Sequence, residues 1–506
     1  ALMSKLEKNK ELKSVILSET PWVMDARNET EQKRRIAMLF DLNTMSNEKA
    51  NALRKLQNQQ LSKGGWPWFG GTKPNRYITQ HIVAGFGHLA KLNVPDIKSN
   101  NTVQSMIKNA VYYLDQELVK DFNQIKKQGV KLDEDHLNNI HIHYLYARSF
   151  FLNTFPLKPE TMKSYQYFLG QSKQYWLTQN IYLQGMIALA NSRNDDNETA
   201  IKIMESINDK ALHDEEMGMY WRKNNGYYWT EAPIERQALL IEAFDQILDD
   251  DKSVEEMKLW LLKQKQTQSW ETTKATSNAI YALLLRGKDL LASSNTVTVS
   301  VGNQIIDPET DNTLDTEAGT GYFKKVWTEV NTDMSSVTFE NKGKTVAWGS
   351  VYWQYFEQLD NITGHNSPLA IKKELYKEVK TKTGNKIQKI DNQTKITLGD
   401  RIIVRVVIQS DRDMEFVHLK DMRASGLEPV NVLSEMKYQD GLRYYQSTKD
   451  AATHFFFDWL PKGTFVFEYP LFVAQKGSFS NGITTIQCMY APEFSAHSKG
   501  TRLSTD

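Results

Sequence analysis

The sequence has little cysteine, almost no net charge and no long apolar run. Cys488 is the only cysteine among 506 residues, which excludes an internal disulfide and a zinc site built on several cysteines. The 62 basic residues nearly balance the 61 acidic ones, for a net charge of +1. This balance gives no electrostatic reason to expect nucleic acid or an anionic membrane as a partner. No apolar run of about 18 residues occurs, so the sequence predicts no membrane-spanning helix.

Several motifs of common enzymes are also missing. A G-x-S-x-G elbow, a P-loop and an H-E-x-x-H pair do not occur, and "GTG" at 319–321 does not form a dinucleotide fingerprint. The three histidines of "HLNNIHIH" (His136, His141 and His143) do not share one helix face, so we interpret them as core or solvated side chains. Acidic clusters at 194–198 and 249–251 fall between helical segments, where turns and N-caps are expected. We therefore predict no catalytic residue, metal or cofactor.

Helical periodicity dominates the chain up to about residue 292. Segments such as "QHIVAGFGHLAKL" and "ERQALLIEAFDQIL" place apolar residues at spacings of three and four. Short polar or Gly/Pro-containing segments separate them, so we predict an array of about ten or more helices.

Aromatic turns repeat within this array. "GWPW" at 65–68, "GYYWT" at 226–230 and "QSWET" at 268–272 each lead into a helix rich in apolar residues. Helical hairpins must stack to bury their faces, and the irregular spacing favours a closed ring, an α/α toroid, over an open solenoid. We predict that aromatic rings at one rim lock neighbouring hairpins together. The residues predicted for this structural role are Trp66, Trp68, Tyr77, Trp229 and Trp270.

One aromatic turn shares a spacing with another helical family. "QLSKGGW" at 60–66 has the Q-x-x-x-G-x-W spacing of terpene cyclases. The D-x-D-D motif of cyclases that protonate their substrate is absent from this sequence. We interpret the shared spacing as a sign of toroid packing.

Strand patterns follow from about residue 293. "NTVTVSVGN" alternates apolar and polar residues, and "DRIIVRVVIQS" and "GTFVFEYPLFVAQ" are further strand candidates between Gly- and Asn-containing turns. Short strands at this spacing predict antiparallel β-sandwiches. The basic run at 371–389 is interrupted by glutamates, and we interpret it as a solvated linker or a strand edge. The predicted fold class is thus multidomain α and β, with a toroid at 1–292, a β segment at 293–367 and a β-sandwich at 368–506.

Three stretches in order resemble the C-terminal third of bacterial alpha-2-macroglobulin-like proteins. "GGWPWFGGTKPNRYITQHIVAGFGHL" and "WLLKQKQTQSWETTKATSNAIYALL" resemble parts of that family's thioester domain. "LPKGTFVFEYPLFVAQKGSFSNGITTIQCMYAPEFSAHS" resembles its last β-sandwich, where a Met-Tyr-x-Pro-Glu turn follows the final strands. The resemblance implies that residues 293–367 are the returning half of a CUB-like domain, and that Tyr490 and Pro492 shape the terminal turn.

The resemblance also implies a function. The family traps proteases: a bait region is cut, the molecule rearranges, and a Cys-x-Glu-Gln thioester links to the protease. No Cys-x-Glu-Gln occurs in this sequence, and Cys488 in "IQCMYAPE" cannot supply it. We expect Cys488 to be a buried structural thiol.

The chain does not begin with methionine, and we expect it to be a piece of a longer broad-spectrum endopeptidase inhibitor. Its domains would be non-enzymatic interaction modules. The resemblance implies that the full-length protein meets proteases in the periplasm or cell envelope, with a lipoprotein anchor upstream. We expect neither nucleic acid nor membrane contact for this segment.

Two other classes of function remain open. A toroidal glycosidase or lyase with β accessory domains would need two carboxylates facing each other in an open cleft. A filled toroid centre would instead favour the inhibitor. The third class is a structural adhesion module.

Overall fold

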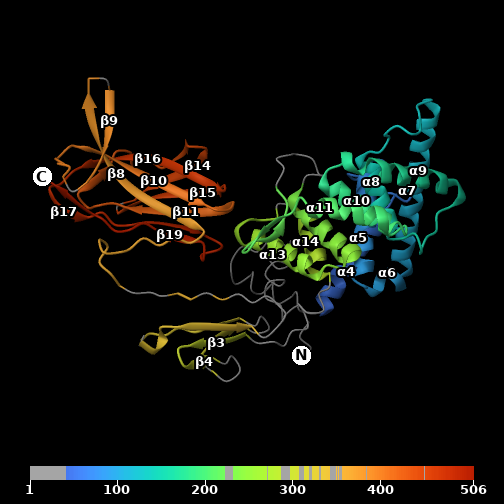
Figure 1. The fold of residues 1–506 in the computed structure, drawn as a ribbon, viewed down its shortest axis with the longest axis horizontal. Coiled ribbons are helices and arrows are strands. Elements are labelled where there is room, and N and C mark those ends of the chain that lie inside the picture. Colours follow the sequence, from blue (N-terminus) through green and yellow to red (C-terminus); the bar gives the residue numbers. More distant parts are fainter. Residues whose placement is uncertain are drawn as a thin grey trace. The chain divides into compact units, whose positions relative to one another are not determined.

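The described residues of the computed structural model form two compact units, a helical unit that also carries small sheets and a C-terminal unit of strands (Figure 1). The structure describes residues 42–222, 232–270, 272–285, 297–306, 311, 313–317, 322–329, 332–341, 349, 351–352, 356–382, 384–391, 393–449 and 451–506.

The helical unit consists of helices joined by short turns. They are α4 (Leu42–Gln59), α5 (Arg76–Lys91), α6 (Pro95–Ser99), α7 (Asn101–Lys127), α8 (Asn139–Ser149), α9 (Pro159–Tyr175), α10 (Ile181–Ser192), α11 (Asn197–Asn208), α12 (Pro233–Ala243), α13 (Asp251–Thr267) and α14 (Thr273–Leu284). A short hairpin of β1 (Leu212–Asp214) and β2 (Gly218–Tyr220) follows α11. Asparagine starts several helices: the side chains of Asn75, Asn100, Asn138 and Asn180 accept hydrogen bonds from first-turn N–H groups, which would otherwise lack partners.

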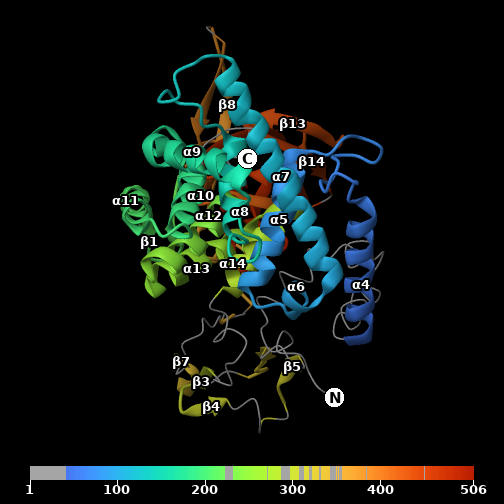
Figure 2. The same ribbon diagram turned by 90° about the vertical axis from the view of Figure 1, so that its right-hand side faces the viewer.

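Alternate helices form an inner ring. Helix α5 packs on α8, α8 on α10, α10 on α12 and α12 on α14, while α7, α9 and α11 lie outside them (Figure 2). The ring closes where the imidazole of His88 on α5 stacks on the phenol ring of Tyr281 on α14, with ring centroids 3.9 Å apart. The α/α toroid predicted from the sequence is therefore confirmed.

The core of the toroid is apolar between its helices. Helix α10 is buried along almost its whole length, from Tyr182 to Asn191, because it is surrounded by other helices. Gly185 on this helix faces α12, and a Cβ there would lie 3.1 Å from a methyl carbon of Leu240. Helices α10 and α12 can therefore approach closely at this glycine.

Small antiparallel sheets follow the helices. Strands β3 (Val297–Val301), β4 (Gln304–Ile306) and β7 (Val337–Asn341) form one sheet in the order β4-β3-β7, and β5 (Asp315–Glu317) pairs with β6 (Tyr322–Lys324). Val299, Val301 and Ile306 form a small apolar cluster there.

Two antiparallel sheets form the C-terminal unit. Their strands are β8 (Leu369–Thr381), β9 (Gly384–Lys389), β10 (Arg401–Ser410), β11 (Met414–Met422), β12 (Leu427–Pro429), β13 (Glu435–Gln439), β14 (Leu442–Thr448), β15 (Ala452–Leu460), β16 (Gly463–Val473), β17 (Gly477–Ser480), β18 (Thr484–Cys488), β19 (Ser495–His497) and β20 (Arg502–Thr505). One sheet has the order β12-β16-β10-β8-β9 and the other β13-β14-β15-β11-β18-β19, with β17 and β20 paired beside them. The predicted antiparallel β-sandwich is confirmed.

Alternation along the strands creates the core between the two sheets. On β10 the side chains of Ile402, Val404, Val406 and Ile408 are fully buried, while the residues between them are partly exposed. A buried ion pair crosses this core: Lys373 Nζ lies 2.8 Å from Asp421 Oδ1.

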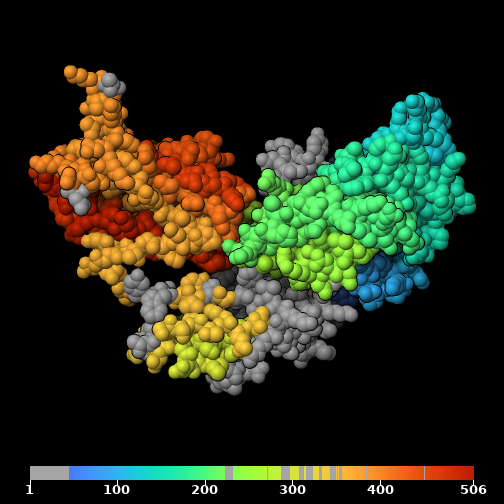
Figure 3. Space-filling view, viewed as in Figure 1, coloured from blue at the N-terminus to red at the C-terminus, as the bar shows by residue number. Residues whose placement is uncertain are grey.

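The basic run at 371–389 forms a hairpin. It makes up most of β8 and β9, and β9 is an edge strand of its sheet, so a strand edge is correct and a linker is not. The tip of this hairpin projects from the surface of the C-terminal unit (Figure 3). Lys372 and Lys389 both pair with Glu374 on its outer face, which holds the pKa of that carboxyl at about 2.

Candidate functional site

Two of the tryptophans predicted for a structural role are buried in the toroid. Trp66 is 1% exposed; its indole Nε1 donates a hydrogen bond to the carbonyl of Leu56 (2.8 Å), and its backbone N–H donates to Thr79 Oγ1 (3.0 Å). Trp66 thus joins the end of α4 to the start of α5. Trp270, before α14, is equally buried. Trp229 lies outside the described residues.

The neighbouring aromatic residues lie differently. Trp68 is 53% exposed and Phe69 is 70% exposed, so neither is enclosed between hairpins. The indole of Trp68 stacks on the ring of Tyr77, with centroids 6.0 Å apart, and Tyr77 in turn contacts the ring of His143 at 5.5 Å. A locking role for Trp68 and Tyr77 stays a prediction.

The terminal turn is exposed. Tyr490 is 78% exposed and packs edge-on against Phe416, with centroids 5.4 Å apart, and Pro492 is also exposed. The backbone N–H of Met489 donates to the carbonyl of Phe416 at 2.9 Å, which fixes the start of the turn. Cys488 just before it is buried, and burial raises the pKa of its thiol.

The three histidines of "HLNNIHIH" do not converge. His141 Nε2 contacts Asp121 Oδ2 at 3.0 Å, His136 Nε2 contacts the carbonyl of Lys131 at 2.9 Å, and His143 is buried beside Tyr77. Within the described ranges, no three His, Cys, Asp or Glu side chains are grouped so that they could hold a metal ion. No described helix combines the length and hydrophobicity needed to span a bilayer.

Buried polar groups occupy the centre of the ring near the C-terminal ends of its helices. The carboxylate of Glu242 on α12 has no exposed surface; it accepts hydrogen bonds from Tyr146 Oη on α8 (2.6 Å) and from the guanidinium of Arg193 after α10. Burial acts to raise the pKa of Glu242, but the charges of Arg193, His88 and Lys91 and the hydrogen bond from Tyr146 together outweigh it, so the pKa lies below its ordinary value. His88 Nε2 lies 2.8 Å from the hydroxyl of Tyr146, and burial lowers its pKa to about 4.

A second polar group lies nearer the N-terminal ends of the same helices. Glu235 on α12 is 6% exposed, and its carboxylate lies 3.9 Å from Lys274 Nζ on α14. Burial lowers the pKa of Lys274, and burial with the Lys274 charge lowers the pKa of His81 on α5 to about 4. Glu235 and Glu242 are two turns apart on one helix face, each buried and paired with a cation, so they do not face each other across an open cleft.

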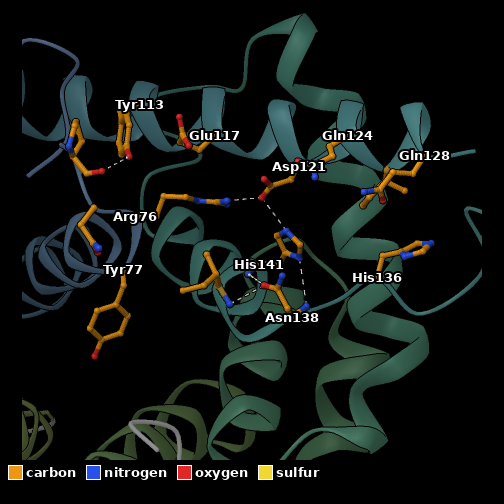
Figure 4. Close-up of a pocket in the computed structure, with 14 residues that line it drawn as sticks. Arg76, Tyr77, Tyr113, Glu117, Asp121, Gln124, Gln128, His136, Asn138 and His141 are labelled. Carbon is orange, nitrogen blue, oxygen red and sulfur yellow. Dashed lines mark hydrogen bonds and ion pairs between the residues drawn. The ribbon is translucent and has the colours of Figure 1, made fainter. Parts of the chain in front are cut away.

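A cavity of about 620 Å³ lies between α7 and the starts of α5 and α8 (Figure 4). We call it the rim pocket. It is lined by Pro74, Asn75, Arg76, Tyr77, Tyr113, Glu117, Asp121, Gln124, Ile125, Gln128, His136, Asn138, Ile140 and His141. Tyr113, Glu117, Asp121, Gln124 and Gln128 recur at spacings of three and four along α7, so one stripe of this helix forms a side of the pocket.

Asp121 is the centre of the rim pocket. Its Oδ2 accepts a hydrogen bond from the guanidinium Nη1 of Arg76 and contacts His141 Nε2, so it connects the starts of α5 and α8 to α7 (Figure 4). Burial acts to raise the pKa of Asp121, but the hydrogen bonds from His141 and Arg76 outweigh it and the pKa lies below its ordinary value. His141 is held in turn by the capping box with Asn138.

The lining of the rim pocket is polar. It includes carboxylates, imidazoles, phenols and side-chain amides, but no serine, threonine, cysteine or lysine. Sequence reasoning missed the pocket. The polar stripe on α7 was a signal, but the partners Arg76, Asp121 and His141 come from three separate helices.

Comparison with known proteins identifies the C-terminal unit. Residues 369–493 match the family described as the bacterial alpha-2-macroglobulin MG10 domain. The match covers most of the C-terminal sandwich, from the start of β8 to the turn after β18. This confirms, for the MG10 domain, the resemblance seen in its last strands and in the turn at 489–493. No curated protein has a sequence that matches the chain significantly.

Solved structures of bacterial alpha-2-macroglobulins are similar to the chain at low sequence identity. Trypsin-activated alpha-2-macroglobulin from Escherichia coli is 11% identical, with a TM-score of 0.40, and the match covers 100% of this chain and 33% of that one. Salmonella alpha-2-macroglobulin reacted with methylamine is 11% identical, with a TM-score of 0.31 and coverages of 98% and 29%. An E. coli fragment from domain MG7 to the C-terminus is 11% identical, with a TM-score of 0.33 and coverages of 96% and 71%.

The chain thus spans about a third of the length of the E. coli alpha-2-macroglobulin that it matches first. The TM-scores are low, so we assign no residue of this chain by overlay. The likeness to this family rests on the match at residues 369–493.

Proposed function

We propose that this chain is the C-terminal part of an alpha-2-macroglobulin-like protease trap and that its domains act as non-enzymatic interaction modules. The observation that carries the proposal is the MG10 match over residues 369–493, at the end of a chain whose first unit is a closed helical ring. We assign modules to 1–292, 293–367 and 368–506, in the order that the family resemblance implies. The partners would be proteases met by the full-length protein in the periplasm or cell envelope.

Two solved structures of one relative support proteases as the partners. The E. coli protein that the chain matches is described as activated by trypsin in one structure and by porcine elastase in another. Because the chain spans about a third of that protein, the bait segment that a protease cuts would lie elsewhere in the full-length molecule.

The centre of the toroid favours this proposal over a glycosidase or lyase. Glycoside hydrolysis needs two carboxyl groups about 5 to 9.5 Å apart on either side of a bound sugar. Glu235 is held near Lys274 and Glu242 near Arg193, both in the packed interior of the ring. A substrate would have to displace these buried ion pairs, at a cost of several kcal/mol for each charge left unpaired.

The trap proposed here holds its protease without a covalent bond from this chain. The sequence has no Cys-x-Glu-Gln, and the thiol of Cys488 is buried on β18 with a raised pKa. A nucleophilic or acyl-forming cysteine needs an accessible thiolate, so Cys488 does not fit that role.

The proposal is tested with the full-length protein and trypsin. We expect trypsin mixed with it to keep its activity on a small chromogenic peptide while its activity on casein falls, because a trapped protease is shielded from large substrates. If the activities on the peptide and on casein fell equally, or if neither fell, the result would contradict a trap. Mass spectrometry after methylamine treatment then tells whether a thioester exists upstream, since a mass gain requires one.

A further inference from the structure

We propose that the rim pocket binds a neutral ligand rich in hydroxyl groups, such as one or two sugar rings. This binding is independent of protease trapping. It uses the cavity between α7 and the starts of α5 and α8, and the polar side chains that converge there (Figure 4).

The charges of the rim pocket favour a neutral ligand. Arg76 pairs with Asp121, and Glu117 pairs with Lys120 at 2.5 Å, so each carboxylate of the lining already has a cation beside it. An entering anion would meet both carboxylates, and an entering cation would compete with Arg76 and Lys120. A ligand without charge avoids both penalties.

The pocket has hydrogen-bonding capacity that the protein leaves unused. Gln124 and Gln128 line the pocket with exposed side-chain amides, each of which can donate and accept. Asp121 uses Oδ2 for both of its contacts, so its Oδ1 is left as an acceptor. Such a set of donors and acceptors suits a ligand that can both donate and accept.

A sugar fits this lining in chemistry and in size. Each hydroxyl can donate to a carboxylate such as Glu117 and accept from a side-chain amide such as Gln124 or Gln128. Pro74, Ile125 and Ile140 supply apolar surface for the C–H face of a ring. A volume of about 620 Å³ lies within the range of small-molecule pockets and exceeds what one small ion needs.

Ligand-observed NMR tests the proposal on the chain of residues 1–506. Saturation-transfer difference spectra are recorded with maltose, lactose and N,N′-diacetylchitobiose, which differ in the arrangement of their hydroxyls. We expect transfer to at least one of them. The double variant E117Q/Q124A should reduce this transfer at least about fivefold, because it removes an acceptor and an amide from the same wall.

A matched control separates binding from folding. Gln116 lies on α7 beside Glu117 but is exposed and does not line the pocket, so Gln116→Ala should leave the transfer unchanged. Circular dichroism must show the same helical content in all variants. Absence of transfer from all three sugars, or transfer that persists in E117Q/Q124A, would overturn the proposal. So would binding of inorganic phosphate without binding of sugar.

Discussion

His88 and Tyr281 stack with their rings 8° from parallel and their centroids 3.9 Å apart, and this contact closes the inner ring between α5 and α14. Tyr281 is 5% exposed, so its ring is part of the packed interior. The two helices come from opposite ends of the helical unit. The contact therefore joins the first inner helix to the last one and contributes to closing the ring.

Replacing Tyr281 by alanine is expected to destabilise the helical unit by about 3 kcal/mol, because it leaves a cavity and removes the stacking on His88. Tyr281→Phe keeps the ring and its stacking and should change stability by less than about 1 kcal/mol. Urea unfolding followed by circular dichroism at 222 nm measures both variants. Equal stability of Tyr281→Ala and the unchanged chain would mean that the ring does not depend on this closure.

Trp66 and Trp68 offer a matched pair two residues apart in one loop. Trp66→Ala should destabilise the helical unit by about 3–5 kcal/mol, since Trp66 is 1% exposed and bonded to Leu56. Trp68→Ala should change stability by less than about 1 kcal/mol, because Trp68 is 53% exposed. Thermal and urea unfolding of both variants decides the point. A large loss in Trp68→Ala would instead establish the locking role predicted from the sequence.

The buried imidazoles should make the toroid sensitive to acid. The pKa of His81 falls from 6.5 to about 4 in the folded chain, so the unfolded chain binds the proton more readily between these values. Stability contributed by neutral His81 is present above pH 6.5 and is lost as the pH falls toward 4, by at most about 3 kcal/mol.

His81→Asn should therefore lose less stability between pH 7 and about pH 4 than the unchanged chain, because it lacks one titrating group. Urea unfolding at a series of pH values gives the comparison. The same acid-induced loss in His81→Asn and in the unchanged chain would contradict the assigned pKa of His81.

The MG10 domain has a matched pair of lysines on β8. The side chain of Lys373 is 4% exposed and pairs with the buried Asp421, whereas that of Lys372 is 69% exposed and pairs with Glu374. Lys373→Met should cost about 3–5 kcal/mol because it leaves Asp421 buried without its cation, and Lys372→Met less than about 1 kcal/mol. Unfolding followed at 218 nm measures the loss. Adding Asp421→Asn to Lys373→Met should restore part of the stability, and no recovery would argue against the ion pair as the cause.

Patterns within single segments explain how much of the fold could be predicted. Alternation in "RIIVRVVIQS" predicts the buried face of β10, and three aromatic turns before apolar helices predict stacked hairpins. The basic run at 371–389, for which a linker was one interpretation, instead lies in β8 and β9, and β8 is anchored because Leu369 and Ile371 are buried at strand spacing.

The rim pocket could not be predicted in the same way. Arg76, Asp121 and His141 are separated by 45 and 20 residues in the chain, and only the packing of α5, α7 and α8 brings them together. No local pattern in the sequence predicts the contacts of Asp121 with Arg76 and His141. The stripe on α7 marks a polar helix face, but a face that is simply exposed to solvent has the same sequence pattern as a face that lines a pocket.

Closure of the ring by His88 and Tyr281 also constrains the order of folding. During synthesis α5 leaves the ribosome long before α14, so the face of α5 that α14 covers must wait for the last inner helix. Contacts between such distant segments form slowly, because the entropy of closing a long loop is lost before the contacts can stabilise the chain. Chains interrupted before α14 would leave the aromatic and ionised groups of the ring centre uncovered, and are expected to be substrates for chaperones and proteolysis.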